Sequence, residues 1–199
     1  TGSMLLMQDG AGCQHAAGGW GYLLGDAGSG YTLAREGLLA VIDASEGLAP
    51  DTPLVADALA YFGTDTPRGL IDRIYAPDAT PDRLAGFAKY VLIHAREGEA
   101  TARDILARNM KRLARSTAQL LKAAPEVAQV GLYGGIFGHS ELARTFFAEE
   151  LAGLAPQAKV CPLICPPELG ALVHLLRKRD GLNEDVLSTM ITTYKEYHQ

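Results

Sequence analysis

The sequence lacks the features of a nucleic-acid-binding or membrane protein. It has no excess of basic residues, since 18 Lys and Arg stand against 23 Asp and Glu, giving a formal net charge of −5. Nucleic-acid binders usually carry a basic surface that displaces counterions from phosphates, so we expect no nucleic-acid partner. No apolar run reaches the roughly 18 residues that a membrane span needs, and no signal peptide opens the chain. We therefore expect a cytoplasmic protein without a membrane partner.

The chain is also poor in cysteine. Its three cysteines, Cys13, Cys161 and Cys165, cannot form a disulfide framework. Cys161 and Cys165 have three residues between them, and no second pair exists to complete a four-ligand metal site, so we expect no metal bound by the chain alone. We expect these two cysteines to be small apolar residues at a strand end. The histidines are scattered, and only His139, which follows a glycine pair, is a candidate functional histidine.

The composition predicts a folded chain with an unusual beginning. The 199 residues are 48% hydrophobic and 21% charged, which is typical of a folded protein of about one large domain. Nine of the 22 glycines fall in the first 30 positions. Such density costs backbone entropy on folding, so it indicates tight turns or main chain that approaches a ligand closely.

The pattern of apolar and turn residues predicts an α/β fold. The expected strands cover residues 3–8, 13–17, 20–24, 129–133 and 159–164, with a hairpin turn at Asp9-Gly10. The expected helices cover residues 29–45, 52–62, 68–75, 81–97, 99–122 and 140–154, and two more begin at Pro167 and Asn183. Hairpin strands, then helices, then alternating strands and helices predict a mixed sheet with an inserted helical segment at about 46–124.

The two long central helices are predicted from their apolar stripes. Thr80 is the expected cap of the first, with Pro81 in its first turn. The stripe of the second helix contains Leu106, Met110 and Leu113, with Thr117 as its one polar member. Gly98, between the two helices, predicts that they form an antiparallel pair.

Three segments could carry chemistry, and the first is Thr1-Gly2-Ser3. Hydroxyl residues beside glycine let backbone amides and hydroxyl groups approach a phosphate. The alternative is a chain end without a function, and these three residues alone favour it.

The second segment runs from Gly18 to Gly30. Here Gly18 and Gly19 let the chain approach a ligand, Trp20 can offer its face to a sugar ring, and Asp26 can accept hydrogen bonds from two adjacent hydroxyls. The alternative is a glycine-rich join in which Asp26 only caps the following helix.

The third segment, residues 130–140, is a strand that leads into Gly134-Gly135 and a helix start. At such a join a nucleotide can lie against main chain near the positive end of a helix. The segment contains neither the G-x-G-x-x-G fingerprint nor a P-loop, and ligand-free joins of this kind are common.

Together the three segments resemble the BadF/BadG/BcrA/BcrD-type ATPase family, which includes N-acetylglucosamine and glucosamine kinases of the actin-like superfamily. Residues 1–3 resemble the end of a Gly-Thr-Gly-Ser phosphate loop, and residues 18–29 resemble a sugar-site signature, Gly-Gly-Trp-Gly…Gly-Asp-Glu-Gly-Ser. Gly134-Gly135-Ile136-Phe137 is similar to the adenosine motif, and residues 167–172 to a late helix start.

The resemblance implies an RNase H-like, actin-like ATPase half that phosphorylates an amino sugar such as N-acetylglucosamine or glucosamine with ATP and Mg. It implies that Thr1, Gly2, Ser3, Gly134 and Gly135 contact the nucleotide. Substrate contacts are implied for Gly18, Gly19, Trp20 and Asp26. No Asp-Gly-Gly-Gly-Thr loop occurs in the sequence. We therefore expect residues 1–199 to be the C-terminal half, with catalytic residues in an N-terminal half that is absent, and to be inactive alone.

Two alternatives and one departure accompany the resemblance. Some members of the family are ATPase activators of an acyl-CoA reductase or dehydratase, and the chain could instead be a non-catalytic sugar-sensing module. Ala27 stands where the family usually has Glu, which leaves the sugar's identity open. A half-protein would expose the apolar face that its partner half covers, so we also expect a homodimer.

Overall fold

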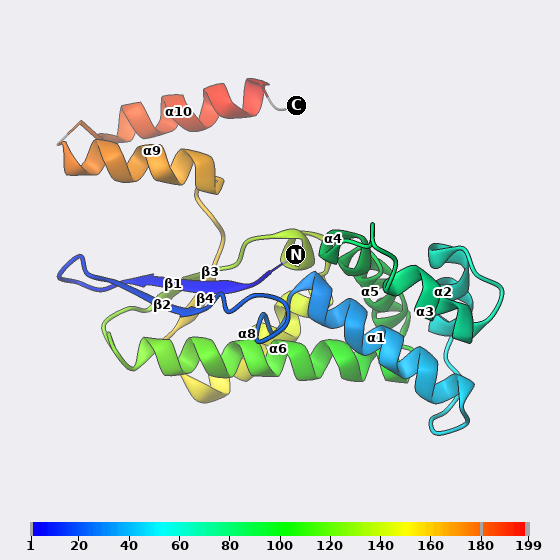
Figure 1. Ribbon diagram of the computed structural model, residues 1–199. Coiled ribbons are helices and arrows are strands. Elements are labelled where there is room, and N and C mark those ends of the chain that lie inside the picture. Colours follow the sequence, from blue (N-terminus) through cyan, green and yellow to red (C-terminus); the bar gives the residue numbers. More distant parts are fainter. Residues whose placement is uncertain (1, 180, 198–199) are drawn as a thin grey trace. The chain divides into compact units, whose positions relative to one another are not determined.

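The computed structural model describes residues 2–179 and 181–197, and it divides the chain into two compact units. Unit 1 covers Thr1–Val160 and unit 2 covers Cys161–Gln199. Figure 1 shows the course of the chain within each unit. Within the described ranges, none of the helices combines the length and apolar character that a bilayer span requires.

Unit 1 begins with the predicted hairpin. Strands β1 (Met4–Gln8) and β2 (Gln14–Gly18) pair antiparallel, with the first residue of each opposite the last residue of the other. The turn is held by Asp9, whose Oδ1 accepts hydrogen bonds from the backbone amides of Ala11 and Cys13. An aspartate at the start of a turn favours this arrangement, because its short side chain reaches amides two residues on.

The prediction of a third strand at residues 20–24 is wrong. The chain forms turns there, and the amides of Leu24 and Gly25 both donate to the carbonyl oxygen of Gly21. Gly19 and Gly21 have φ angles of 70° and 79°. A β-strand requires negative φ, so these two glycines direct the chain into a loop between β2 and the first helix.

The helices predicted up to residue 122 are present, with one division. They are α1 (Gly30–Ser45), α2 (Leu54–Phe62), η1 (Pro67–Gly69), α3 (Leu70–Ile74), α4 (Pro81–Ala85), α5 (Ala88–Glu97) and α6 (Ala100–Leu121). Ser29 caps α1 by accepting a hydrogen bond from the amide of Thr32. Gly98, with φ 93°, ends α5 before the antiparallel α6 begins.

The prediction of a single helix at 81–97 is wrong, because α4 and α5 are separate helices. The hydroxyl of Tyr61, on α2, donates to the carbonyl oxygen of Arg83 at a distance of 2.8 Å. A Cβ added at Gly86 would lie 2.3 Å from that hydroxyl oxygen. The missing side chain of Gly86 therefore leaves room for a tyrosine from another helix, which the apolar pattern of residues 81–97 does not reveal.

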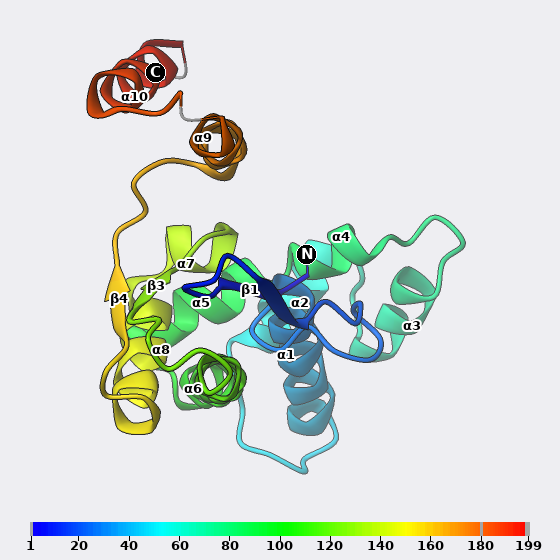
Figure 2. The ribbon, with the colours of Figure 1, turned by 90° about the vertical axis from the view of Figure 1, so that its left-hand side faces the viewer.

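Helix α6 is the centre of unit 1. It packs against α1, α5, the later helix α8 (Glu141–Leu154) and both strands of the hairpin, as Figures 1 and 2 show. The largest fully buried side chains lie on these helices and on α2, or just before α5. They include Leu33, Val41, Leu54, Phe87, Val91, Ile105, Leu106, Met110, Phe147 and Leu151. Each such side chain removed from water stabilises the fold by about 1.5–3 kcal/mol.

The last part of unit 1 alternates as predicted, with shorter strands. Strand β3 (Gln129–Gly131) is followed by α7 (Gly135–His139) and α8, and β4 (Lys159–Cys161) pairs with β3. Among the described residues the four strands form two two-stranded sheets, where the sequence predicted one mixed sheet. The strand predicted at 129–133 ends at Gly131. Gly134 follows three residues later with a φ of 107°, which an extended strand does not allow.

Unit 2 contains the two predicted terminal helices, α9 (Pro167–Lys178) and α10 (Glu184–Tyr197). Asn183 caps α10 by accepting a hydrogen bond from the amide of Val186 at 2.8 Å. The hydroxyl of Tyr194, on α10, donates to the carboxylate of Glu168, on α9. None of the described side chains of α9 and α10 is fully buried.

Candidate functional site

The first two candidate segments meet at the start of β1. Ser3 Oγ donates a hydrogen bond of 2.9 Å to the carbonyl oxygen of Ala27, 24 residues later in the chain. The carbonyl oxygen of Ser3 in turn accepts from the amide of Gly19 at 3.1 Å. A Cβ added at Gly2 would lie 2.9 Å from Asp26 Oδ2. The predicted phosphate segment and the predicted sugar segment are therefore neighbours, although Thr1 lies outside the described residues.

Asp26 is the strained centre of this site. It has a φ of 62°, and it is the only described residue other than glycine with a positive φ. Its carbonyl oxygen accepts from the amide of Ser29 and from Thr32 Oγ1, which fixes the backbone. Its side chain is buried, and Oδ1 has no hydrogen-bond partner. A buried acceptor without a partner costs about 1–3 kcal/mol, and strain of this kind gathers at ligand sites.

The interpretation of Asp26 as a cap of the following helix is wrong. Ser29 supplies the cap of α1 through its own hydroxyl, and the carboxylate of Asp26 makes no hydrogen bond to the helix. The carboxylate of Asp26 therefore does not cap α1, and its predicted contact with a sugar stays a prediction.

Helix α6 holds the loop that contains Asp26 and Gly28 in place. The amide of Gly28 donates to Asn109 Oδ1 at 3.1 Å, and Asn109 Nδ2 donates to the carbonyl oxygen of Ile105. Gly28 has a φ of 78°, and a Cβ added there would lie 3.1 Å from Leu113 Cδ2 and 3.2 Å from Met110 Cε. The loop therefore presses main chain directly onto the core, and only glycine fits at position 28.

Sequence reasoning missed Asn109. Thr117 is not the one polar member of the α6 stripe, because Asn109 is also buried, with 3% of its surface exposed. The signal was available, since Asn109 lies about two helical turns before Thr117 and therefore on the same face. A buried asparagine needs partners for both ends of its amide, and the loop amide of Gly28 is one of them.

Trp20 lies on the outer side of the same loop. Its side chain is 74% exposed, and Leu23 and Leu24 beside it are also exposed. A Cβ added at Gly25 would lie 3.0 Å from Trp20 Cβ, so the loop is closely folded at its base. An exposed aromatic ring on a fixed loop can pack against the apolar face of a sugar, but the role of Trp20 stays a prediction.

Gly134 and Gly135 form a separate turn at the start of α7. The carbonyl oxygen of Gly134 accepts from the amide of Gly138, and a Cβ added at Gly134 or Gly135 would meet nothing within 4 Å. Within the described ranges, no hydrogen bond joins this turn to the loop of Asp26. Figures 1 and 2 show α7 and the start of β1 on the same side of α6. The main chain of this turn is open, as contact with a nucleotide would require.

No cluster of three or more His, Cys, Asp or Glu side chains that could hold a metal ion occurs among residues 2–179 and 181–197. His139, at the end of α7, is exposed. Cys161 ends β4 and is half-buried, in keeping with a small apolar role near a strand end.

Comparison with known proteins decides the family. Residues 1–174 match the BadF/BadG/BcrA/BcrD ATPase family. The chain belongs to this family. The resemblance predicted from the glycine-rich segments is thereby confirmed over most of the chain.

Two curated relatives of this BadF-type chain are sugar kinases. It is 23% identical over 176 residues to an N-acetylmuramic acid/N-acetylglucosamine kinase of Clostridium acetobutylicum, an alignment that covers 87% of this chain. It is 26% identical over 184 residues to an N-acetyl-D-glucosamine kinase of Dictyostelium discoideum, covering 90% of this chain. The chain spans 58% of the length of each of these relatives.

A solved structure shares the fold. A crystal structure of a provisionally assigned N-acetylglucosamine kinase from Chromobacterium violaceum superposes with a TM-score of 0.64 at 25% sequence identity. The match covers 80% of this BadF-type chain and 52% of that structure. The predicted α/β class is therefore supported by a solved relative.

Proposed function

We propose that this chain is the sugar- and nucleotide-contacting half of an ATP-dependent kinase for an amino sugar, such as N-acetylglucosamine or glucosamine. The observation that carries the proposal is the buried, unpartnered oxygen of Asp26 beside Gly2 and Ser3. An acceptor for sugar hydroxyls and a segment suited to phosphates lie side by side, as phosphoryl transfer from a nucleotide to a sugar requires. The names of the two curated relatives support the same substrate class.

Each candidate residue has a role in this proposal. Asp26 accepts hydrogen bonds from sugar hydroxyls, and a sugar lacking them would leave its buried oxygen unpaired. Trp20 packs on the ring, and Gly18 and Gly19 let the main chain come close to it. Around the nucleotide, residues 1–3 approach the phosphates with amides and hydroxyl groups. Gly134 and Gly135 lie against the adenosine near the start of α7.

Phosphoryl transfer then depends on positioning and on neutralising charge. The sugar oxygen attacks the terminal phosphorus, the bond to the leaving diphosphate breaks, and the hydroxyl proton passes to a base. None of the candidate residues is assigned as that base, and we place it in the N-terminal half of the complete kinase. Magnesium bound to the nucleotide would supply positive charge that neutralises the phosphates, and the residues of this chain that would face those phosphates are the segment 1–3. We therefore expect residues 1–199 alone to bind sugar weakly and to turn over no ATP.

The test is the substitution Asp26→Asn, followed by NMR titration with N-acetylglucosamine. The wild-type chain should show saturable shifts at residues 26–29, and Asp26→Asn should weaken the affinity about tenfold or more, because hydrogen bonds to a charged acceptor are worth about 1.5–3 kcal/mol. The matched control is Asp43→Asn, which removes the same charge from an exposed position of α1. Sugar affinity that is unchanged by Asp26→Asn would remove Asp26 from the site.

An assay of ATP consumption, combined with the sugar titration, separates the kinase from a sugar-sensing module. A longer protein that contains this chain should consume ATP only when N-acetylglucosamine is present. Sugar binding at Asp26 without any ATP consumption by that longer protein would overturn the kinase assignment while leaving the sugar site intact.

A further inference from the structure

A second pocket lies away from Asp26, between α5, α6 and the start of α8. It has a volume of about 430 Å³, and three cationic side chains line it: Lys89 and Arg96 from α5, and Arg103 from α6. Glu141 is the one acidic residue among those that line the described pocket. A chain with a net charge of −5 thus gathers positive charge in one concave place.

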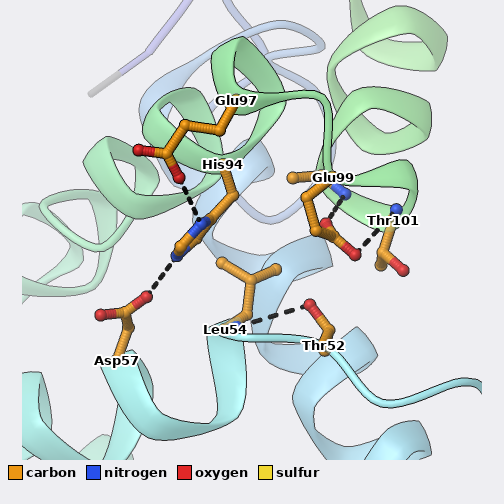
Figure 3. A network of polar contacts seen from close by, with 8 residues as sticks. Thr52, Leu54, Asp57, His94, Glu97, Glu99 and Thr101 are labelled. Atoms are coloured by element: carbon orange, nitrogen blue, oxygen red, sulfur yellow. Dashed lines mark hydrogen bonds and ion pairs between the residues drawn. The ribbon is translucent and has the colours of Figure 1, made fainter.

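Three acidic residues close in sequence to these cations are engaged with other groups, whereas Glu141 in the pocket wall forms no ion pair among the described residues. On α5, Glu97 contacts His94 at 3.2 Å, as Figure 3 shows. Glu99 accepts hydrogen bonds from the first amides of α6. Asp104 pairs with Arg108 at 2.8 Å. No ion pair within the described part of the chain therefore neutralises Lys89, Arg96 or Arg103.

Aromatic rings, rather than carboxylates, position two of the cations. The Arg103 guanidinium carbon lies 5.4 Å from the centroid of the half-buried Phe146 ring. Lys89 Nζ lies 4.7 Å from the centroid of the Tyr90 ring. A ring contact leaves the N–H donors of a guanidinium group available, whereas a bidentate carboxylate would occupy them. The Phe146 ring thus positions Arg103 while the N–H donors of its guanidinium group stay available.

The other side of the pocket is the first turn of α8. Ser140 caps this helix by accepting from the amide of Ala143, and Thr145 adds a hydroxyl to the pocket wall. The start of a helix carries a partial positive charge, which adds to the field of the three cations. Guanidinium groups match the geometry of phosphate oxygens, so the chemistry of this wall suits a phosphate group.

We propose that this pocket binds the phosphate group of a small phosphorylated metabolite of sugar-phosphate size. The site is separate from the Asp26 site and does not depend on the proposed kinase function. Arg96 and Arg103 hold the phosphate oxygens, and Lys89 contributes positive charge at the rim. The three cations give this pocket a local positive charge that attracts an anion although the chain as a whole is negative.

The first test is NMR titration of the full chain with inorganic phosphate and with glucose 6-phosphate. Both should give saturable shifts at Arg96, Arg103 and Thr145, with glucose 6-phosphate binding more tightly. Arg103→Gln should weaken both affinities about tenfold, because a charge-assisted hydrogen bond to phosphate is lost. The control Arg112→Gln removes the same charge from an exposed position of the same helix and should leave both affinities unchanged.

The outcomes are distinct from those of the Asp26 experiment. The thermal unfolding transition of Arg103→Gln shows whether this variant still folds. If it does not, the two affinities are measured instead on Arg96→Gln, a substitution at an exposed position. Shifts confined to Ser3 and Gly134 would overturn the proposal, as would equal weakening by Arg112→Gln. If ATP displaces glucose 6-phosphate and loses the same affinity in Arg103→Gln, the pocket belongs to the nucleotide site and a separate metabolite site is excluded.

Discussion

Two glycine turns in this chain look alike in the sequence and differ in the structure. The turn at 18–28 is locked from several sides: Ser3 holds Ala27, Asn109 holds Gly28, and the core lies directly under Gly28. The turn at Gly134-Gly135 is open, and an added Cβ would meet nothing within 4 Å. Gly28 is thus favoured both by its positive φ and by the side chains packed beneath it, whereas Gly134 is favoured by its φ of 107° alone.

The difference shows where binding energy can come from. The locked turn uses core packing and hydrogen bonds to hold Asp26 in a left-handed conformation with one oxygen unpaired. Such a preformed acceptor can select a ligand because it does not relax when the ligand is wrong. The open turn offers main chain only, which suits a ligand that is recognised by shape and by backbone contact.

The largest effect should come from Gly28→Ala. We expect it to lower the free energy of unfolding by about 2–5 kcal/mol, since a left-handed residue with a Cβ costs roughly 1–2 kcal/mol and overpacking a core roughly 1–3 kcal/mol. Urea denaturation monitored by circular dichroism measures this change. A variant as stable as the wild type would mean that the loop is not pressed onto Leu113 and Met110.

Asn109→Ala should have the next largest effect. It leaves the buried amide of Gly28 without an acceptor, so we expect a loss of about 1–3 kcal/mol in the free energy of unfolding and faster hydrogen exchange at Gly28. The matched control is Thr117→Ala on the same face, because the Thr117 hydroxyl only contacts the carbonyl oxygen of Leu113 within its own helix. Equal exchange at Gly28 in both variants would contradict the anchoring role of Asn109.

Gly135→Ala tests the open turn. Gly135 lies in α7 with space around it, so the free energy of unfolding should be unchanged or higher by up to about 1 kcal/mol. Nucleotide affinity, measured by titration with ATP, should fall if adenosine rests on this main chain. Unchanged ATP affinity would place the nucleotide elsewhere, and the contrast between the two turns would then be one of packing alone.

The smallest effect concerns the hairpin turn before the locked loop. The hydrogen bond from His15, chiefly, and then that from the amide of Cys13, hold the pKa of Asp9 below its usual 3.8. A carboxyl with a lowered pKa in the folded state stabilises that state above its unfolded pKa, and the contribution disappears as the pH falls through the folded value. We therefore expect the protection of the Ala11 and Cys13 amides, which is the factor by which they exchange more slowly than an unstructured chain at the same pH, to fall below pH 3.8.

Asp9→Asn provides the control for that measurement. The amide side chain cannot titrate, so the protection of the Ala11 and Cys13 amides relative to an unstructured chain should no longer change with pH in this range. A pH dependence that persists in Asp9→Asn would assign the transition to another group.

Much of the fold could be predicted because its signals are local. The hairpin follows from Asp9-Gly10, the helix starts from Ser140 and Asn183, and the long α6 from its apolar stripe. Two predictions failed. Residues 81–97 form two helices, with Tyr61 from α2 in the space beside Gly86, and the bends at Gly19 and Gly21 replace the strand expected at 20–24. Neither effect is visible in the periodicity of the segment itself.

The candidate site shows the same division. The sequence predicted Gly2, Ser3, Trp20 and Asp26 as ligand contacts only when their segments were taken together, and the structure places Gly2 and Ser3 beside the loop of Asp26. Asn109 was missed, although its place on the buried face of α6 could have revealed it. The cationic pocket of Lys89, Arg96 and Arg103 could not be foreseen, since these residues and the start of α8 meet only in the folded chain.

The sequence by itself determined the family and the helix starts marked by capping residues, and it supplied the prediction of residues for sugar and phosphate. These properties depend on side-chain chemistry and on spacings of a few residues along the chain. Only the tertiary structure decided that Asp26 keeps an unpaired oxygen beside Ser3, that Asn109 holds the loop and that three cations share one pocket. Those properties depend on distances between segments far apart in sequence, which packing of the core fixes and local pattern does not encode.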